Sequence, residues 1–91
     1  MCLNAGAYDV QHTDIMSDIV SQFKRAQDLD MLSELSQADN LIVATFCDKT
    51  RNYIIDAVVV HLNKKYGQHV YVAKSTINPK VVEVWYREMP T

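Results

Sequence analysis

The most reactive side chains in this 91-residue chain belong to two cysteines and three histidines. Cys47 directly follows an apolar run, so its thiol is expected at the end of a strand and close to the start of a helix. The amides of a helix start and a nearby cation, Lys49 or Arg51, would stabilise a thiolate there, which makes Cys47 a candidate reactive thiol. A free cysteine also behaves as a small hydrophobe, and a buried structural thiol is the interpretation that we favour. Cys2 lies far from it, in the N-terminal arm.

The histidines form no recognisable catalytic or metal-binding set. His61 and His69 flank the end of a predicted helix, but no further Cys, His or carboxylate completes a ligand set at a spacing typical of metal sites. No Ser or Cys is placed to form a nucleophile–base pair with His61, which we interpret as a helix-flank residue beside Asp56. The sequence therefore predicts no metal and no cofactor.

Charge argues against binding to polyanions. The formal net charge is −2, so no general attraction to nucleic acid or to an anionic membrane is expected. Four lysines, Lys64, Lys65, Lys74 and Lys80, can form a modest basic strip with Tyr71, which we interpret as solvated surface. Two cysteines make no disulfide framework, and no run has the form of a signal peptide or a transmembrane segment. A cytoplasmic location is expected.

One stretch organises the elements that position these residues. Leu41–Phe46 is a short run apolar on both faces, which predicts a strand in the centre of a sheet. Tyr53–Tyr66 then has the periodicity of a helix, with either Asp48 or Thr50 as its N-cap and Gly67 as a left-handed C-terminal cap. The apolar side of this helix consists of Ile54, Ile55, Val58, Val59, Leu62 and Tyr66.

The segments before this stretch have weaker patterns. Residues 1–17 are interpreted as an N-terminal extension, or as an arm ending in a short helix from about Thr13, and residues 18–91 as one domain. Ile19–Phe23 is predicted as a short edge strand, with the continuation of that helix as the alternative. Leucines recur at helical spacing in Gln27–Ala38, which predicts a helix.

The segments after Gly67 contain a strand and an ambiguous element. His69–Lys74 is predicted as a strand. Asn78 followed by Pro79 has the form of a helix start, which predicts a short helix over Lys80–Tyr86. Local propensity alone favours a strand there, in a hairpin with the preceding one.

The assembled order resembles a thioredoxin-fold domain from about Ile19 to Thr91. The landmarks that match are Leu41–Phe46 as the central strand, Leu62–Gly67 as the end of the long helix, Val70–Lys74, Asn78-Pro79 and the ending Met89-Pro90-Thr91. The resemblance implies an α/β fold with a βαβαβα core, truncated at its C-terminus, and a cis-proline at Pro90. The alternative is an α+β fold with an N-terminal helix and an antiparallel sheet.

Two departures from that family bear on function. The redox motif C-x-x-C is absent where the family has it, so dithiol–disulfide exchange at that place is excluded. The complete family fold continues beyond the position of Pro90, so the strand Leu41–Phe46 is expected to have an unpaired apolar edge. A protein partner or a second copy is expected to cover this edge.

The sequence therefore favours a non-catalytic, redox-inactive interaction or structural module. By resemblance, its binding surface would consist of Asp48, Lys49, Thr50, Arg51, Met89, Pro90 and Thr91. Trp85 is interpreted as a core aromatic or as an interface anchor. The alternatives are a monothiol redox protein that acts through Cys47 and a small inhibitor or adaptor that binds by strand addition.

Overall fold

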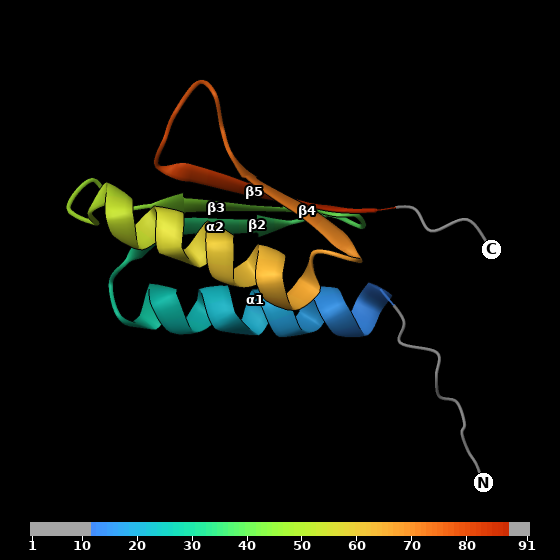
Figure 1. Ribbon diagram of the computed structural model, residues 1–91. Helices are drawn as coiled ribbons and strands as arrows, with labels where there is room; N and C mark the ends of the chain where they lie inside the picture. Colours follow the sequence, from blue (N-terminus) through green and yellow to red (C-terminus); the bar gives the residue numbers. More distant parts are fainter. Residues whose placement is uncertain (1–11, 88–91) are drawn as a thin grey trace, which may run out of the picture.

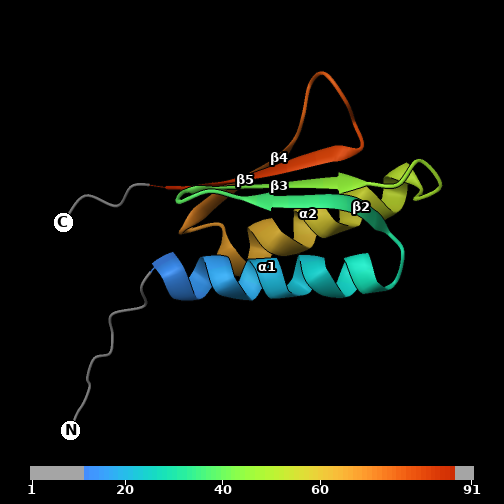
Figure 2. The same ribbon diagram turned by 180° about the vertical axis from the view of Figure 1, so that it is seen from behind.

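The computed structural model describes residues 12–87, which form two helices and one four-stranded sheet (Figure 1). The elements are α1 (His12–Asp28), β2 (Leu32–Gln37), β3 (Leu41–Phe46), α2 (Asn52–Tyr66), β4 (Val70–Lys74) and β5 (Val81–Tyr86). The strand order is β2-β3-β5-β4, and each neighbouring pair is antiparallel. Both helices lie on the same side of the sheet (Figures 1 and 2).

The core lies between the two helices and the covered face of the sheet. Its buried apolar side chains are Ile15, Met16, Ile19, Val20 and Phe23 of α1, Leu32 of β2, Ile42, Ala44 and Phe46 of β3, Ile55, Leu62 and Tyr66 of α2, Val70 and Val72 of β4, and Val82 and Val84 of β5. Alternate residues of the strands face the helices because side chains of a strand point to opposite faces in turn. The rings of Phe23 and Phe46 meet edge to face, with their centroids 6.4 Å apart.

A Schellman motif ends α1. The Met31 amide donates to the Ala26 carbonyl at 2.9 Å, and the Asp30 amide donates to the Gln27 carbonyl at 3.0 Å. Asp30 has φ 63°, in the left-handed region that aspartate tolerates better than most residues. The motif turns the chain sharply from α1 into β2.

The predicted helix over Tyr53–Tyr66 is confirmed, but both predicted caps are wrong. The N-cap position is Arg51, without a side-chain hydrogen bond, and neither Asp48 nor Thr50 caps the helix. Gly67 has φ −61°, which is right-handed. Glycine suits this position for another reason, because a Cβ atom there would clash with the Asn63 carbonyl oxygen.

Three predicted elements are wrong. The segment Ile19–Phe23 is part of α1, not a strand. The helix predicted over Gln27–Ala38 is replaced by the end of α1 and by β2, where the register shifts between Leu32 and Glu34. This bulge lets Leu32 and Leu35 pair opposite Phe46 and Ala44 on the covered face, so a three-residue spacing that mimics a helix fits a strand.

The short helix predicted over Lys80–Tyr86 is also replaced by a strand, β5. Asn78-Pro79 forms a turn instead of a helix start, because the Val81 amide donates to the Asn78 carbonyl at 3.0 Å. The β-branched residues of this segment then pair with both β3 and β4. Local propensity prevailed over the resemblance to a helix start.

The fold belongs to the α+β class, with an N-terminal helix and an antiparallel sheet. The strand–helix–strand order from Leu41 to Lys74 is confirmed, since β3 and β4 run in the same direction, but β5 lies between them. The expected βαβαβα order is wrong for the described residues, and so is the bare edge expected for β3, which pairs with β2 and β5. The predicted cis-proline at Pro90 lies outside the described residues, as does most of the predicted 1–17 extension.

Within the described range, neither helix combines the length and the apolar character that crossing a bilayer requires. The cytoplasmic location expected from the sequence stays a prediction.

The core predicts a large difference between two Ile→Ala substitutions. Ile42 is fully buried between β3 and the helices, so Ile42→Ala should lower the free energy of unfolding by about 2–5 kcal/mol. Ile77, in the β4–β5 loop, is 92% exposed, and Ile77→Ala should change stability by less than about 0.5 kcal/mol. Urea unfolding followed by circular dichroism measures both. Ile42→Val, with an expected loss of about 1 kcal/mol, serves if Ile42→Ala does not fold; equal effects at the two sites would contradict the assigned core.

Candidate functional site

The loop between β3 and α2, predicted as a binding surface, is a structural junction. The carbonyl oxygen of Met31 accepts two hydrogen bonds from this loop, from the Cys47 amide at 2.8 Å and from the Thr50 hydroxyl at 2.9 Å. The Lys80 ammonium group donates to the Thr50 carbonyl. Thr50 is buried, and its bonds join the α1–β2 turn, the β3–α2 loop and the β4–β5 loop.

The other predicted binding residues do not gather around this loop. Asp48, Lys49 and Arg51 are exposed in it. Trp85 lies near the opposite end of β5, opposite Leu41 in the register, whereas Lys80 and the loop lie near the Phe46 end of β3. The predicted residues Met89, Pro90 and Thr91 lie outside the described residues. The structure therefore does not unite the predicted site.

Cys47 and the histidines form no catalytic constellation in the part of the chain that the structure describes. Cys47 is a free, half-buried thiol, and the structural role favoured from its sequence position stays a prediction. His61 is exposed on α2, and His69 is half-buried in the turn before β4. Residues 12–87 contain no group of three or more His, Cys, Asp or Glu side chains able to hold a metal ion.

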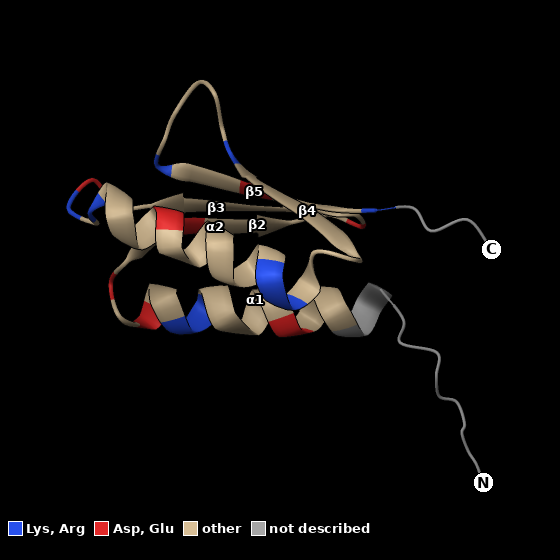
Figure 3. Ribbon diagram, viewed as in Figure 1, with Lys and Arg blue, Asp and Glu red and all other residues tan. Residues whose placement is uncertain are grey.

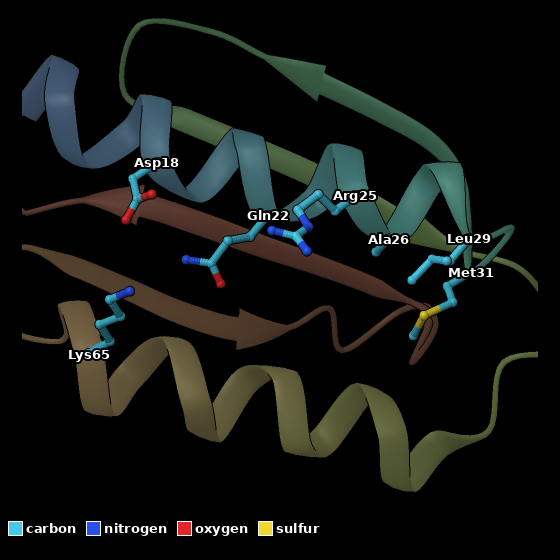
Figure 4. A pocket seen from close by; sticks show the side chains of 7 residues that line it. All are labelled: Asp18, Gln22, Arg25, Ala26, Leu29, Met31 and Lys65. Atoms are coloured by element: carbon cyan, nitrogen blue, oxygen red, sulfur yellow. The ribbon is translucent and has the colours of Figure 1, made fainter.

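A groove of about 490 Å³ separates α1 from α2 (Figure 4). Its lining residues are Asp18, Gln22, Arg25, Ala26, Leu29, Met31 and Lys65. At one end the Tyr66 hydroxyl donates to the Asp18 carboxylate and accepts from the Gln22 amide at 2.9 Å. These bonds tie the two helices together, and the residues that line the groove include no serine, threonine, cysteine or histidine.

The side of the sheet away from both helices presents apolar residues where an antiparallel sheet usually presents polar ones. We call this surface the open face; it consists of Leu41 and Val43 of β3, Tyr71 and Ala73 of β4, and Val81, Glu83 and Trp85 of β5. Leu41, Trp85 and Tyr71 form one row across the three strands, since Trp85 pairs with both neighbours in the register. Trp85 is 42% exposed and Tyr71 is 54% exposed.

A cation and a preorganised loop flank the open face. The Arg87 guanidinium lies 5.8 Å from the centre of the Tyr71 ring, within the range of a cation–π interaction. Beyond the other end of the face, the β4–β5 loop rises away from the helices (Figures 1 and 2). The Ser75 hydroxyl accepts the amide of Ile77 at 3.1 Å, which orders the loop around the exposed Ile77 side chain.

Of the open-face residues, only Trp85 is among the binding residues predicted from the sequence, and its binding role stays a prediction. Tyr71 was interpreted as part of a basic strip, and Leu41 and Val43 as buried on both sides of a central strand. The alternation of Val81, Glu83 and Trp85 is a signal for one strand face, but it is readable only if this segment is a strand and not a helix.

The free strand edges are poorly suited to accept an added strand. Ser75 donates its amide to β5 at 2.8 Å, so the alternation of an antiparallel ladder turns the backbone groups of Val70 and Val72 outward. Arg87 Nε donates to the Val70 carbonyl at 3.2 Å, and Asn63 Nδ2 donates to the Val72 carbonyl at 3.1 Å. At the other edge, β2 is bulged and mostly polar.

The junction predicts a stabilising role for Thr50. Thr50→Val removes the hydroxyl that bonds to Met31 at nearly constant volume, and should lower the free energy of unfolding by about 1 kcal/mol. Thr76→Val, in the exposed part of the β4–β5 loop, is the matched control, with an expected change under about 0.5 kcal/mol. Urea unfolding compares them; a neutral Thr50→Val would show that the junction does not stabilise the fold.

The hydrogen bonds between the two helices predict that the Tyr66 hydroxyl stabilises the fold. Tyr66→Phe removes the bonds to Asp18 and Gln22 and should cost about 1 kcal/mol, since water replaces the lost partners in part. Tyr53→Phe, at an exposed tyrosine of the same helix, should leave thermal unfolding unchanged. Equal melting temperatures for the two variants would rule out a stabilising tie at Tyr66.

Comparisons with known proteins assign the chain to no family. No family model matches its sequence, no curated protein matches it, and no solved structure matches its fold.

Proposed function

We propose that this chain is a non-catalytic interaction module that binds a protein partner through the open face. The main support for this proposal is the row formed by Leu41, Trp85 and Tyr71, with Arg87 beside the Tyr71 ring. Tryptophan, tyrosine and arginine are the residues that most often dominate the binding energy of protein interfaces. Trp85 and Tyr71 sit on paired strands, so little backbone conformational entropy is lost there when a partner binds.

Charge favours a protein partner over nucleic acid. The open face has a carboxylate, Glu83, at its centre, and Glu34 of β2 lies on the same side of the sheet. Arg87 is the cation that flanks the aromatic row. Lys74 and Lys80 are engaged elsewhere, with the Asp56 carboxylate at 2.8 Å and with the Thr50 carbonyl. A surface that binds single-stranded nucleic acid combines stacking aromatics with a positive groove, and this face has no such excess of positive charge.

The two alternative functions have less support. A monothiol mechanism would rest on Cys47 alone, and its thiol is half-buried. Strand addition would need free acceptors on an edge strand, whereas side chains already bond to the carbonyls of Val70 and Val72. The resemblance to thioredoxin-fold domains stays an expectation from the sequence, and it contributes no binding residue to this proposal.

The proposal is tested with selected protein ligands. Peptides are selected for binding from a displayed library on the immobilised protein. They should bind the open face, because its exposed row of apolar side chains can bury apolar residues of a peptide. Trp85 is the only tryptophan, so a ligand without tryptophan that covers it should shift the emission of the complex to shorter wavelength. Tyr71→Ala should weaken binding about 10- to 100-fold, as expected at a hot spot.

The matched control is Tyr53→Ala, which removes another exposed tyrosine, on the helix side of the molecule, and should leave affinity unchanged. Calorimetry gives the affinities, including that of Trp85→Ala. Ligands that bind the Tyr71→Ala and wild-type proteins equally well would refute the open face as the binding surface. So would quenching of Trp85 by single-stranded oligonucleotide at physiological salt when no selected peptide affects its emission.

A further inference from the structure

The helix α2 has a second apolar stripe that its own core does not use. Tyr53, Ala57 and Val60 recur at helical spacing on the side of α2 opposite the buried Ile55 and Leu62. Tyr53 is 68% exposed and Val60 is 53% exposed. We call the set Tyr53, Asp56, Ala57, Val60, His61 and Lys64 the outer stripe; it lines a shallow hollow of about 420 Å³.

Charge along the outer stripe is arranged symmetrically about Val60. Asp56 stands four residues before Val60, and Lys64 stands four residues after it, so all three lie on one side of the helix. In Figure 3, the red of acidic residues marks the first half of α2, and the blue of basic residues marks its last turn. Within one chain Asp56 and Lys64 are about 12 Å apart along the axis, too far to pair with each other.

We propose that α2 is a homodimer interface, in which two copies pair their outer stripes in antiparallel orientation about a two-fold axis at Val60. In this arrangement Val60 of each copy packs against the other, and Asp56 of one copy lies opposite Lys64 of its partner, twice by symmetry. Parallel pairing would place like charges opposite each other and would align the helix dipoles unfavourably. The charge pattern therefore selects a second, antiparallel copy of this chain.

The neighbouring residues fit the same arrangement. Tyr53 stands seven residues before Val60, and Gly67, which has no side chain, stands seven residues after it. The bulky ring of one copy therefore meets the smallest residue of its partner. The Asp56 carboxylate already accepts from Lys74 of its own chain at 2.8 Å, and its second oxygen remains available for the partner's Lys64.

The dimer would leave the proposed binding surface free. The outer stripe belongs to α2, and both helices lie on the side of the sheet away from the open face (Figures 1 and 2). Two open faces would then belong to one particle, and a partner with repeated sites would bind it with avidity. A contact made by one helix of each copy is small, so we expect a dissociation constant on the order of 10–100 μM.

Sedimentation equilibrium tests the dimer on the full chain between about 1 and 500 μM, where the mean mass should rise from that of one 10.4 kDa chain towards twice that value. Lys64→Glu places a carboxylate opposite Asp56 and should raise the dissociation constant at least about tenfold; Asp56→Lys should do the same. The double variant Asp56→Lys with Lys64→Glu restores opposite charges and should recover dimerisation. Lys65→Glu, the adjacent lysine outside the stripe, is the control and should have little effect.

Cysteine cross-linking tests the orientation, with Cys2 and Cys47 replaced by serine. Val60→Cys lies on the axis and should form an intermolecular disulfide under mild oxidation, whereas Tyr53→Cys should not, because the antiparallel arrangement separates the two copies of residue 53. Circular dichroism confirms that each variant is folded. A monomer at every concentration, equal effects of Lys64→Glu and Lys65→Glu, or no recovery in the double variant would overturn the proposal. Loss of the dimer in Trp85→Ala would overturn it in favour of the open face.

The proposed dimer and the proposed binding role of the open face can be refuted independently of each other. Lys64→Glu should not change the affinity of a monovalent ligand selected on the open face, and Tyr71→Ala should not change the dissociation constant of the dimer. A change in both quantities in either variant would show that one surface serves both roles, and that result would contradict the assignment of dimerisation to α2 alone.

Discussion

Burial of one sheet face beneath two helices is the interaction on which this structure depends. Each strand contributes alternate apolar residues to the same layer, and α1 and α2 seal it from water on one side. A chain of this size has one core, so few residues can be spared from it. Because both helices are used on the same side, the opposite face of the sheet has no cover from the described residues. The core therefore does not dictate the composition of that face, which is the proposed binding surface.

The two ends of the sheet differ in the kind of residues that they carry. At the Phe46 end of β3, the Met31 carbonyl, the Thr50 hydroxyl and the Lys80 ammonium group hold three connecting segments together. At the other end, Trp85 and Tyr71 project into solvent from paired strands. A site on strands is more rigid than one on loops. The connection that precedes the long helix is thus used for stability, and the aromatic surface lies on the sheet.

The helix α2 is apolar on two sides, which matters for folding and for the proposed dimer. Its inner side fills the core through Ile55, Leu62 and Tyr66, and its outer side exposes Tyr53 and Val60. A helix that only covers a sheet would present polar residues to water. The outer apolar residues reduce the difference in polarity between the two sides of α2. They also leave a surface whose charges are complementary to those of a second copy.

The sequence by itself determined the elements whose periodicity is unambiguous. The strand Leu41–Phe46, the helix over Tyr53–Tyr66 and the strand that ends at Lys74 follow from apolar runs and helical spacing, which local sequence carries. Tertiary structure decided the rest, because it depends on pairing between distant residues. The bulge after Leu32 exists only opposite β3, and Val81–Tyr86 becomes a strand because β3 and β4 supply partners on both sides. That pairing also sets which face Trp85 occupies, since a shift of one residue in register moves every side chain of a strand to the other face.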